Sequence, residues 1–160
     1  ADGYGWSASD REHYGSYVID FLHNFDDGRY LGDVVQPDGT PVFLSEEIIH
    51  MEVVKALISL LYLVAIGAAI IPVVFALLLS RRGGVGVRPG LFAGSILTLV
   101  AAIGLGVMGF LGFDAFFTRF HELLFTEGTW QFFVDDSLIR LFPQQFWVDA
   151  GIGVAVIINW

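Results

Sequence analysis

Hydrophobic residues are gathered into long runs that contain no charged side chain. One run covers residues 56–79 and a second covers residues 91–113. An α-helix rises about 1.5 Å per residue, so about 20 residues are enough to cross roughly 30 Å of hydrocarbon. The two runs therefore predict transmembrane helices over residues 51–80 and 91–113. A third apolar run, residues 144–160, is short for a span, and we expect it to be the first part of another transmembrane helix.

Smaller elements are predicted before the first of these helices. Apolar residues at helical spacing predict a short amphipathic helix over residues 14–25. A strong turn sequence at residues 37–39 is flanked by extended stretches around residues 31–35 and 41–44, which predict short strands. Ser45 is the expected N-cap of the first long helix.

The connection between the two spans, residues 81–90, indicates how they are oriented. It carries basic charges without acidic ones, and these are Arg81, Arg82 and Arg88. Short loops rich in arginine stay in the cytoplasm. Residues 1–50 and the aromatic, interface-like residues 114–143 are then extracytoplasmic.

An extracytoplasmic first segment needs a preceding span or a removed signal peptide. We therefore expect one helix before Ala1 and the remainder of another after Trp160. The predicted fold is an all-α membrane protein, with three helices visible in this chain and four in the full protein. An outward-facing polar and aromatic cap of short helices and strands completes it.

The composition narrows the classes of function. Hydrophobic residues make up 55% of the chain and charged residues only 16%, whereas globular domains carry about 25% charged residues. The net charge of −9 gives nucleic acid no electrostatic reason to bind. The chain has no cysteine, which excludes disulfides and thiol chemistry.

Two histidines, His50 and His121, are the strongest candidates for chemistry. Each lies where a predicted extracytoplasmic segment meets a transmembrane helix. Imidazole exchanges a proton near neutral pH, so a pair on one side of the bilayer predicts an acid–base site for a lipid-linked substrate. His121 and Glu122 begin like the zinc motif H-E-x-x-H, but residue 125 is phenylalanine, and we expect no metal site.

Three basic residues near the predicted interfaces are weaker candidates. Lys55 follows His50 by little more than one helical turn, and it is equally consistent with an interfacial anchor and an active-site cation. Arg119 and Arg140 are consistent with binding lipid phosphate, with stacking on aromatic rings and with simple anchoring. His13 and His23 are expected to be ordinary surface or packing residues.

Two blocks of the sequence resemble a bacterial integral membrane family, the lipoprotein intramolecular transacylases (Lit). The first block contains Ser45, Glu46, His50, Met51, Glu52, Val53, Val54 and Lys55. The second block contains Phe120, His121, Glu122, Phe125, Trp130, Asp136, Leu138, Ile139, Phe142, Pro143 and Phe146. The resemblance covers most of residues 14–150. It implies four spans and an extracytoplasmic catalytic region in the bacterial cytoplasmic membrane.

The resemblance also implies a reaction. An ester-linked acyl chain would move from the glyceryl group of a diacylglyceryl lipoprotein to the α-amino group of its N-terminal cysteine. His50 and His121 would be the catalytic pair, no cofactor would be needed, and the partners would be the lipoprotein and membrane lipid. Lys55, Arg119 and Trp130 are expected to position the substrate or to contact lipid.

One departure from the family pattern leaves other interpretations open. The pattern has an acidic residue directly before Val54, whereas this chain has Val53 there and its nearest acid is Glu52. A non-catalytic subunit that keeps the family fold and packs against partner membrane subunits is the main alternative. A lipid-binding or transport component has less support, because no predicted span is expected to carry a buried charge beyond Lys55. Approach of the two histidines to within about 4–7 Å, beside an open cleft that faces the lipid, would favour catalysis. Rings that point apart, or a partner chain that fills the cleft, would favour the subunit.

Overall fold

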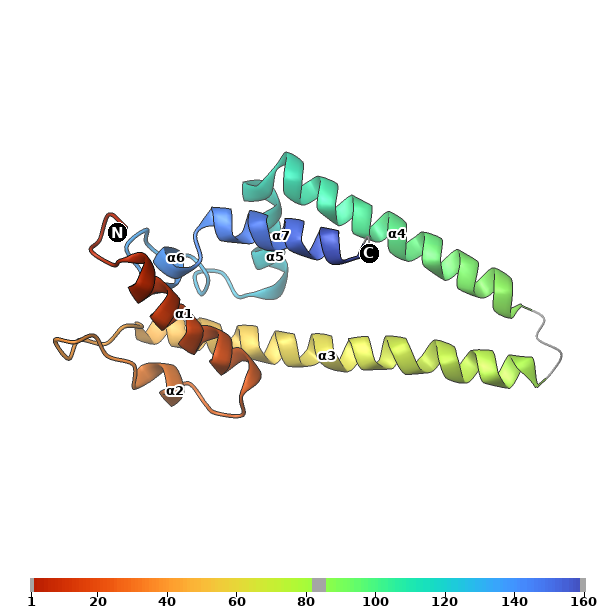
Figure 1. Cartoon of the computed structure of the whole chain (residues 1–160), viewed down its shortest axis with the longest axis horizontal. Coiled ribbons are helices and arrows are strands. Elements are labelled where there is room, and N and C mark those ends of the chain that lie inside the picture. Colours follow the sequence, from red (N-terminus) through yellow and green to blue (C-terminus); the bar gives the residue numbers. More distant parts are fainter. Residues whose placement is uncertain (1, 82–85, 159–160) are drawn as a thin grey trace. The chain divides into compact units, whose positions relative to one another are not determined.

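The computed structural model describes residues 2–81 and 86–158, and these residues are helical without a strand (Figure 1). The helices are α1 (Ala8–His23), α2 (Arg29–Gly32), α3 (Ser45–Ser80), α4 (Val87–Leu111), α5 (Phe113–Leu124), α6 (Ser137–Leu141) and α7 (Gln144–Ile158). They divide between two compact units. The first combines Ala1–Ile58 with Phe117–Trp160, and the second is Ser59–Phe116. The predicted all-α fold class is confirmed.

α3 and α4 are long and apolar enough to cross a membrane. α3 has 36 residues, and the candidate span in α4 covers Val87–Gly109. Apolar side chains along both helices are exposed rather than packed in a protein core, as expected of surfaces that face hydrocarbon. The chain is therefore a membrane protein with two candidate spans.

Two other parts of the predicted topology are the loop over residues 81–90 and the last helix, α7. Arg82 of the loop over residues 81–90 lies outside the described residues, and the cytoplasmic side of this loop stays a prediction. α7 has 15 residues in the described part of the chain, which corresponds to about 22 Å and is less than the hydrocarbon thickness. Its role as the beginning of a further span also stays a prediction.

The first unit has a small hydrophobic core. Its buried members are Trp6, Tyr14, Val18, Phe21, Leu31, Val34, Val42, Phe43, Met51, Leu138 and Leu141. The helix predicted over residues 14–25 is present as α1, but it begins at Ala8. Ser7 and Asp10 form a capping box there, in which each side chain accepts the other residue's backbone N–H. Phe25 lies beyond the end of α1 and is fully exposed.

The two strands predicted on either side of the turn at residues 37–39 are wrong. The chain before the turn forms the single helical turn of α2 instead. In the described part of the chain, Val35 and Pro41 make an isolated antiparallel bridge. The N–H of Gln36 donates to the carbonyl of Thr40 at 2.8 Å, so the turn itself is tight. α2 ends at Gly32 and α3 begins at Ser45, so only short segments flank the turn, and they pair through a single bridge instead of forming strands.

A buried carboxylate organises the beginning of α3. The N–H of Ile48 donates to the carbonyl of Leu44, so Leu44 rather than the predicted Ser45 is the N-cap. Glu47 is only 1% exposed. Its carboxylate accepts the backbone N–H of Leu44 at 2.8 Å and that of Leu138 at 2.6 Å. Glu47 thereby ties the beginning of α3 to α6.

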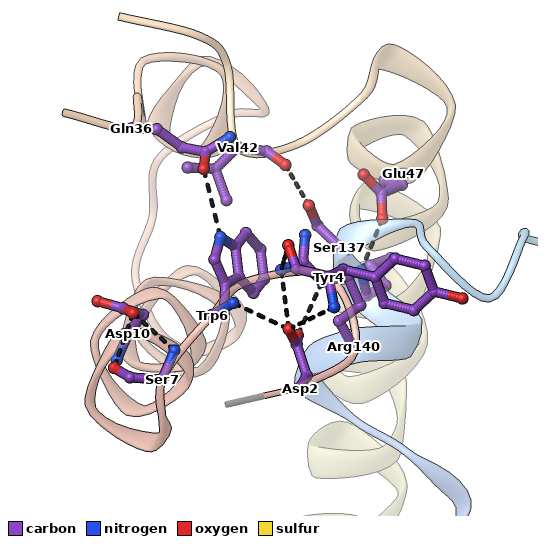
Figure 2. A network of polar contacts seen from close by, with 11 residues as sticks. Asp2, Tyr4, Trp6, Ser7, Asp10, Gln36, Val42, Glu47, Ser137 and Arg140 are labelled. Carbon is purple, nitrogen blue, oxygen red and sulfur yellow. Dashed lines mark hydrogen bonds and ion pairs between the residues drawn. The ribbon is translucent and has the colours of Figure 1, made fainter. Parts of the chain in front are cut away.

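Arg140 fastens α6 to the N-terminal segment (Figure 2). Its guanidinium pairs with Asp2 at 2.9 Å and lies 3.5 Å from the centre of the Trp6 ring. The hydrogen bond from Arg140 is the main cause that lowers the pKa of Asp2 to about 2. Close by, the hydroxyl of Ser137 donates to the carbonyl of Val42. Arg140 is therefore a structural residue, and stacking on an aromatic ring is the one of its predicted roles that the structure shows.

Candidate active site

The structure brings together the two histidines that the sequence singles out. His50 lies in the second turn of α3 and His121 lies near the end of α5. Their ring centroids are 6.2 Å apart and the ring planes differ by only 18°. Both residues belong to the first unit. At this separation a group placed between the rings could exchange protons with both of them.

Aromatic residues surround the pair, and we call four of them the aromatic shell: Phe117, Phe125, Trp130 and Phe132. Phe120 also meets His121 edge-on, with 5.5 Å between the ring centroids. Phe125 contacts both histidines, with its ring centroid 4.7 Å from His50 and 5.2 Å from His121. Phe132 meets His50 edge-on at 5.3 Å. On the other side, His121 lies 3.9 Å from Phe117 and 5.0 Å from Trp130. The two imidazoles are consequently almost closed off, with exposed fractions of 8% for His50 and 9% for His121.

The hydrogen bonding of His121 determines which of its nitrogens can take a proton. Its Nδ1 lies 2.7 Å from the backbone carbonyl of Phe117. A carbonyl can only accept, so Nδ1 carries the hydrogen, and in the neutral ring Nε2 presents a lone pair. Burial lowers the pKa of His121 below its ordinary value of 6.5. At neutral pH the ring is therefore neutral, with Nε2 available as a base.

His50 is confined by packing. Among the described residues its Nδ1 is buried without a hydrogen-bond partner. The rings of Phe125 and Phe132 press on it from two directions. Its position is therefore set by aromatic contacts, by a hydrogen bond with the backbone of Thr129 and by the beginning of α3, one turn after Glu47.

The three second-rank candidates have different surroundings. Trp130 belongs to the aromatic shell beside His121. Arg119 is exposed and pairs with Glu122 at 2.8 Å on the same helix. Lys55 donates to the side chain of Asn24 at 2.8 Å and to a backbone carbonyl in the segment after α1. Of the three, the structure brings Trp130 to the histidines.

The departure at Val53 can be judged from the neighbouring carboxylate. Glu52 accepts the backbone N–H of Gly28 at 3.0 Å, which holds the beginning of α2 against α3. Val53 itself is exposed. Glu52, the nearest acid in the sequence, thus has a structural contact of its own at Gly28.

The structural role of Glu47 could not be predicted from the sequence. Its place in the first turn of a helix indicated only a favourable interaction with the helix dipole. Its bond to Leu138 spans 91 residues of sequence, and no local pattern signals such a contact. Among the described residues, no group of three histidine, aspartate or glutamate side chains is arranged to hold a metal ion.

Residues 2–147, which contain both histidines and the aromatic shell, match the family described as "Lipoprotein intramolecular transacylase Lit". The chain belongs to the Lit family. An uncharacterized protein of Aquifex aeolicus (strain VF5) is 32% identical to it over 120 residues. These residues make up 75% of this chain and 53% of that protein, so the chain spans about half the length of this curated relative. No solved structure matches the chain significantly.

Proposed function

We propose that this Lit family member is a membrane transacylase for diacylglyceryl lipoproteins, acting at the extracytoplasmic face of the bacterial cytoplasmic membrane. It moves an ester-linked acyl chain from the glyceryl group to the α-amino group of the N-terminal cysteine. The observation that carries the proposal is the separation of 6.2 Å between the parallel rings of His50 and His121. Two imidazoles at this distance can serve as base and acid for one bound substrate.

His121 is the better placed of the two to act as the base. Its Nδ1–H is held by the carbonyl of Phe117, which leaves the lone pair of Nε2 to take the proton of the substrate's α-ammonium. An α-ammonium titrates near 7.7 and an imidazole near 6.5, so this transfer is uphill in water. Inside the aromatic shell the ammonium loses its hydration, which lowers its pKa just as burial lowers the pKa of His121.

The neutral amine then attacks the ester carbonyl. A carbon–nitrogen bond forms, the carbon–oxygen bond to the glyceryl group breaks, and the departing oxygen takes the second amine proton. His50 is suited to stabilise the tetrahedral oxyanion or to pass this proton on. Amine and ester belong to one molecule, so the attack closes a ring of about eight atoms, and a site that folds the substrate would favour it.

The test is mass spectrometry of the N-terminal peptide of a reporter lipoprotein. The host lacks N-acylation and expresses the full-length parent protein, its His50→Ala variant or its His121→Ala variant. We expect an N-acyl, S-monoacylglyceryl cysteine with the parent and a loss of at least about a hundredfold in each variant, since general acid–base catalysis contributes roughly 10²–10⁴-fold.

The alternative of a non-catalytic subunit gives the opposite result. A diacylglyceryl cysteine that stays unchanged while the parent protein is correctly inserted would rule out the transacylase. Co-purification would then identify the partner membrane subunits that this alternative requires.

An exposed position provides the control for the histidine variants. Leu123→Ala on α5 removes a largely exposed side chain and is expected to leave the product unchanged.

A further inference from the structure

The aromatic shell closes the histidine pair from solvent with side chains that offer water few hydrogen bonds: three are phenylalanines, and the indole N–H of Trp130 is the one polar group of these side chains. Phe125 touches both imidazoles, and Phe132 and Trp130 each cover one of them. An ordered buried water usually makes about three hydrogen bonds to polar groups. Phenylalanine rings supply none, so the surroundings of the pair disfavour a water molecule next to the reacting centre.

Exclusion of water has a particular consequence for acyl transfer, because water competes with the amine for the same ester. Attack by water joins its oxygen to the acyl carbon and breaks the bond to the glyceryl oxygen, which takes a proton. The products are a free fatty acid and a lyso-lipoprotein whose α-amino group is unmodified. The substrate's own amine is delivered by its covalent tether, whereas water must diffuse in from outside the shell.

Phe132 is the member of the shell best suited to decide between the two nucleophiles. It is partly buried and packs against the hydrophobic core of the first unit, so its position is fixed. From that position its ring meets His50 edge-on, with 5.3 Å between centroids. The next residue, Phe133, has the same side chain but is 79% exposed.

We propose that Phe132 is a specificity-determining residue, which keeps water from the histidine pair so that the acyl chain passes to the amine instead of being hydrolysed. The proposal rests on the proposed function and adds to it the reason why the protein is a transferase rather than an esterase. Loss of the ring opens a path for water beside His50 while leaving both histidines in the protein.

The experiment uses the purified full-length parent protein in lipid nanodiscs, with a synthetic diacylglyceryl lipopeptide as the substrate. Mass spectrometry quantifies the N-acyl product and the free fatty acid in the same reaction. We expect Phe132→Ala to raise the share of hydrolysis by about tenfold, which corresponds to about 1.4 kcal/mol of lost discrimination. Phe133→Ala makes the same chemical change at an exposed position and is expected to keep the parent's share.

The product ratio separates this role from simple packing. A lower total rate with an unchanged share of hydrolysis in Phe132→Ala would overturn the proposal and leave the transacylase intact. Phe132→Val removes less volume, and if the alanine variant loses its thermal transition the same criterion applies to valine, with a smaller rise expected. A parent protein that forms no N-acyl product would refute the proposed function, and the role of Phe132 with it.

Discussion

Removal of the Glu47 carboxylate should destabilise the first unit more than removal of the neighbouring, exposed carboxylate of Glu46. Glu47 is buried and accepts two backbone N–H groups, one from Leu44 and one from Leu138. Figure 2 shows the Glu47 side chain and the second of these bonds. Glu47→Ala takes away both acceptors. Glu47→Gln keeps one oxygen but turns an NH₂ group toward the other N–H, so a donor faces a donor.

The size of the effect follows from how each N–H is placed. The bond to Leu138 is buried, and a buried donor left without a partner costs about 1–3 kcal/mol. Leu44 is exposed, so water can replace its lost acceptor at little cost. We therefore expect Glu47→Ala to lose about 2–3 kcal/mol and Glu47→Gln to lose somewhat less. For a chain of this size that corresponds to a fall in apparent Tm of about 5–10 °C.

The assay is thermal unfolding of the detergent-solubilised protein, with transacylase activity measured in parallel. Glu46→Ala is the matched control, because Glu46 is the preceding residue, carries the same charge and is exposed. Equal Tm values for Glu46→Ala and Glu47→Ala would refute the assignment. Activity should fall together with stability in the Glu47 variants, because His50 lies one turn further along α3 and depends on the position of that turn.

Two further predictions concern pH and close packing. Burial lowers the pKa of His121 below 6.5 in the folded protein, so the unfolded chain binds a proton at this ring more readily than the folded chain does. Stability is therefore unaffected above about pH 7 and falls as the pH drops from about 6.5 through the lower pKa of the folded state. The apparent Tm should fall more steeply between pH 7.5 and 5 in the parent protein than in His121→Gln, and equal slopes would contradict this. At Gly28 a Cβ would come within 2.7 Å of both Glu52 Oε1 and Ile48 Cγ2, whereas at Gly32 the nearest atom is 3.6 Å away. Gly28→Ala should therefore cost about 1–3 kcal/mol, and Gly32→Ala, measured in the same unfolding assay, should be tolerated.

The features that the sequence predicted well depend on short-range patterns. Uninterrupted apolar runs identify helices of spanning length without knowledge of any neighbour, and α3 and α4 confirm them. Helical spacing likewise predicted the apolar face of α1. Tyr14, Val18 and Phe21 are buried, and Tyr17 and Leu22 pack partly buried against the core, but Phe25 is exposed. The histidine pair was found through its place in two sequence blocks, although spacing alone could not show that the rings would meet.

The features that the sequence missed depend on contacts between distant segments. The turn at residues 37–39 could be recognised from the sequence. Whether the segments on either side of it form strands or helices depends on how they pack onto the core. Lys55 looked equally like an anchor and a catalytic cation until its contacts with the segment after α1 were visible. The aromatic shell was read only as an interfacial belt, because composition does not reveal which rings face inward.

The same distinction bears on Val53, the position where this chain departs from the family pattern. An acid near a catalytic histidine commonly fixes the ring's orientation and tautomer. Here the backbone carbonyl of Phe117 already does this for His121, and the rings of Phe125 and Phe132 confine His50. The pair can therefore be oriented without a carboxylate at position 53, and we expect catalysis to survive the departure. The parent protein carries this valine, so its own formation of N-acyl product, or failure to form it, decides the point.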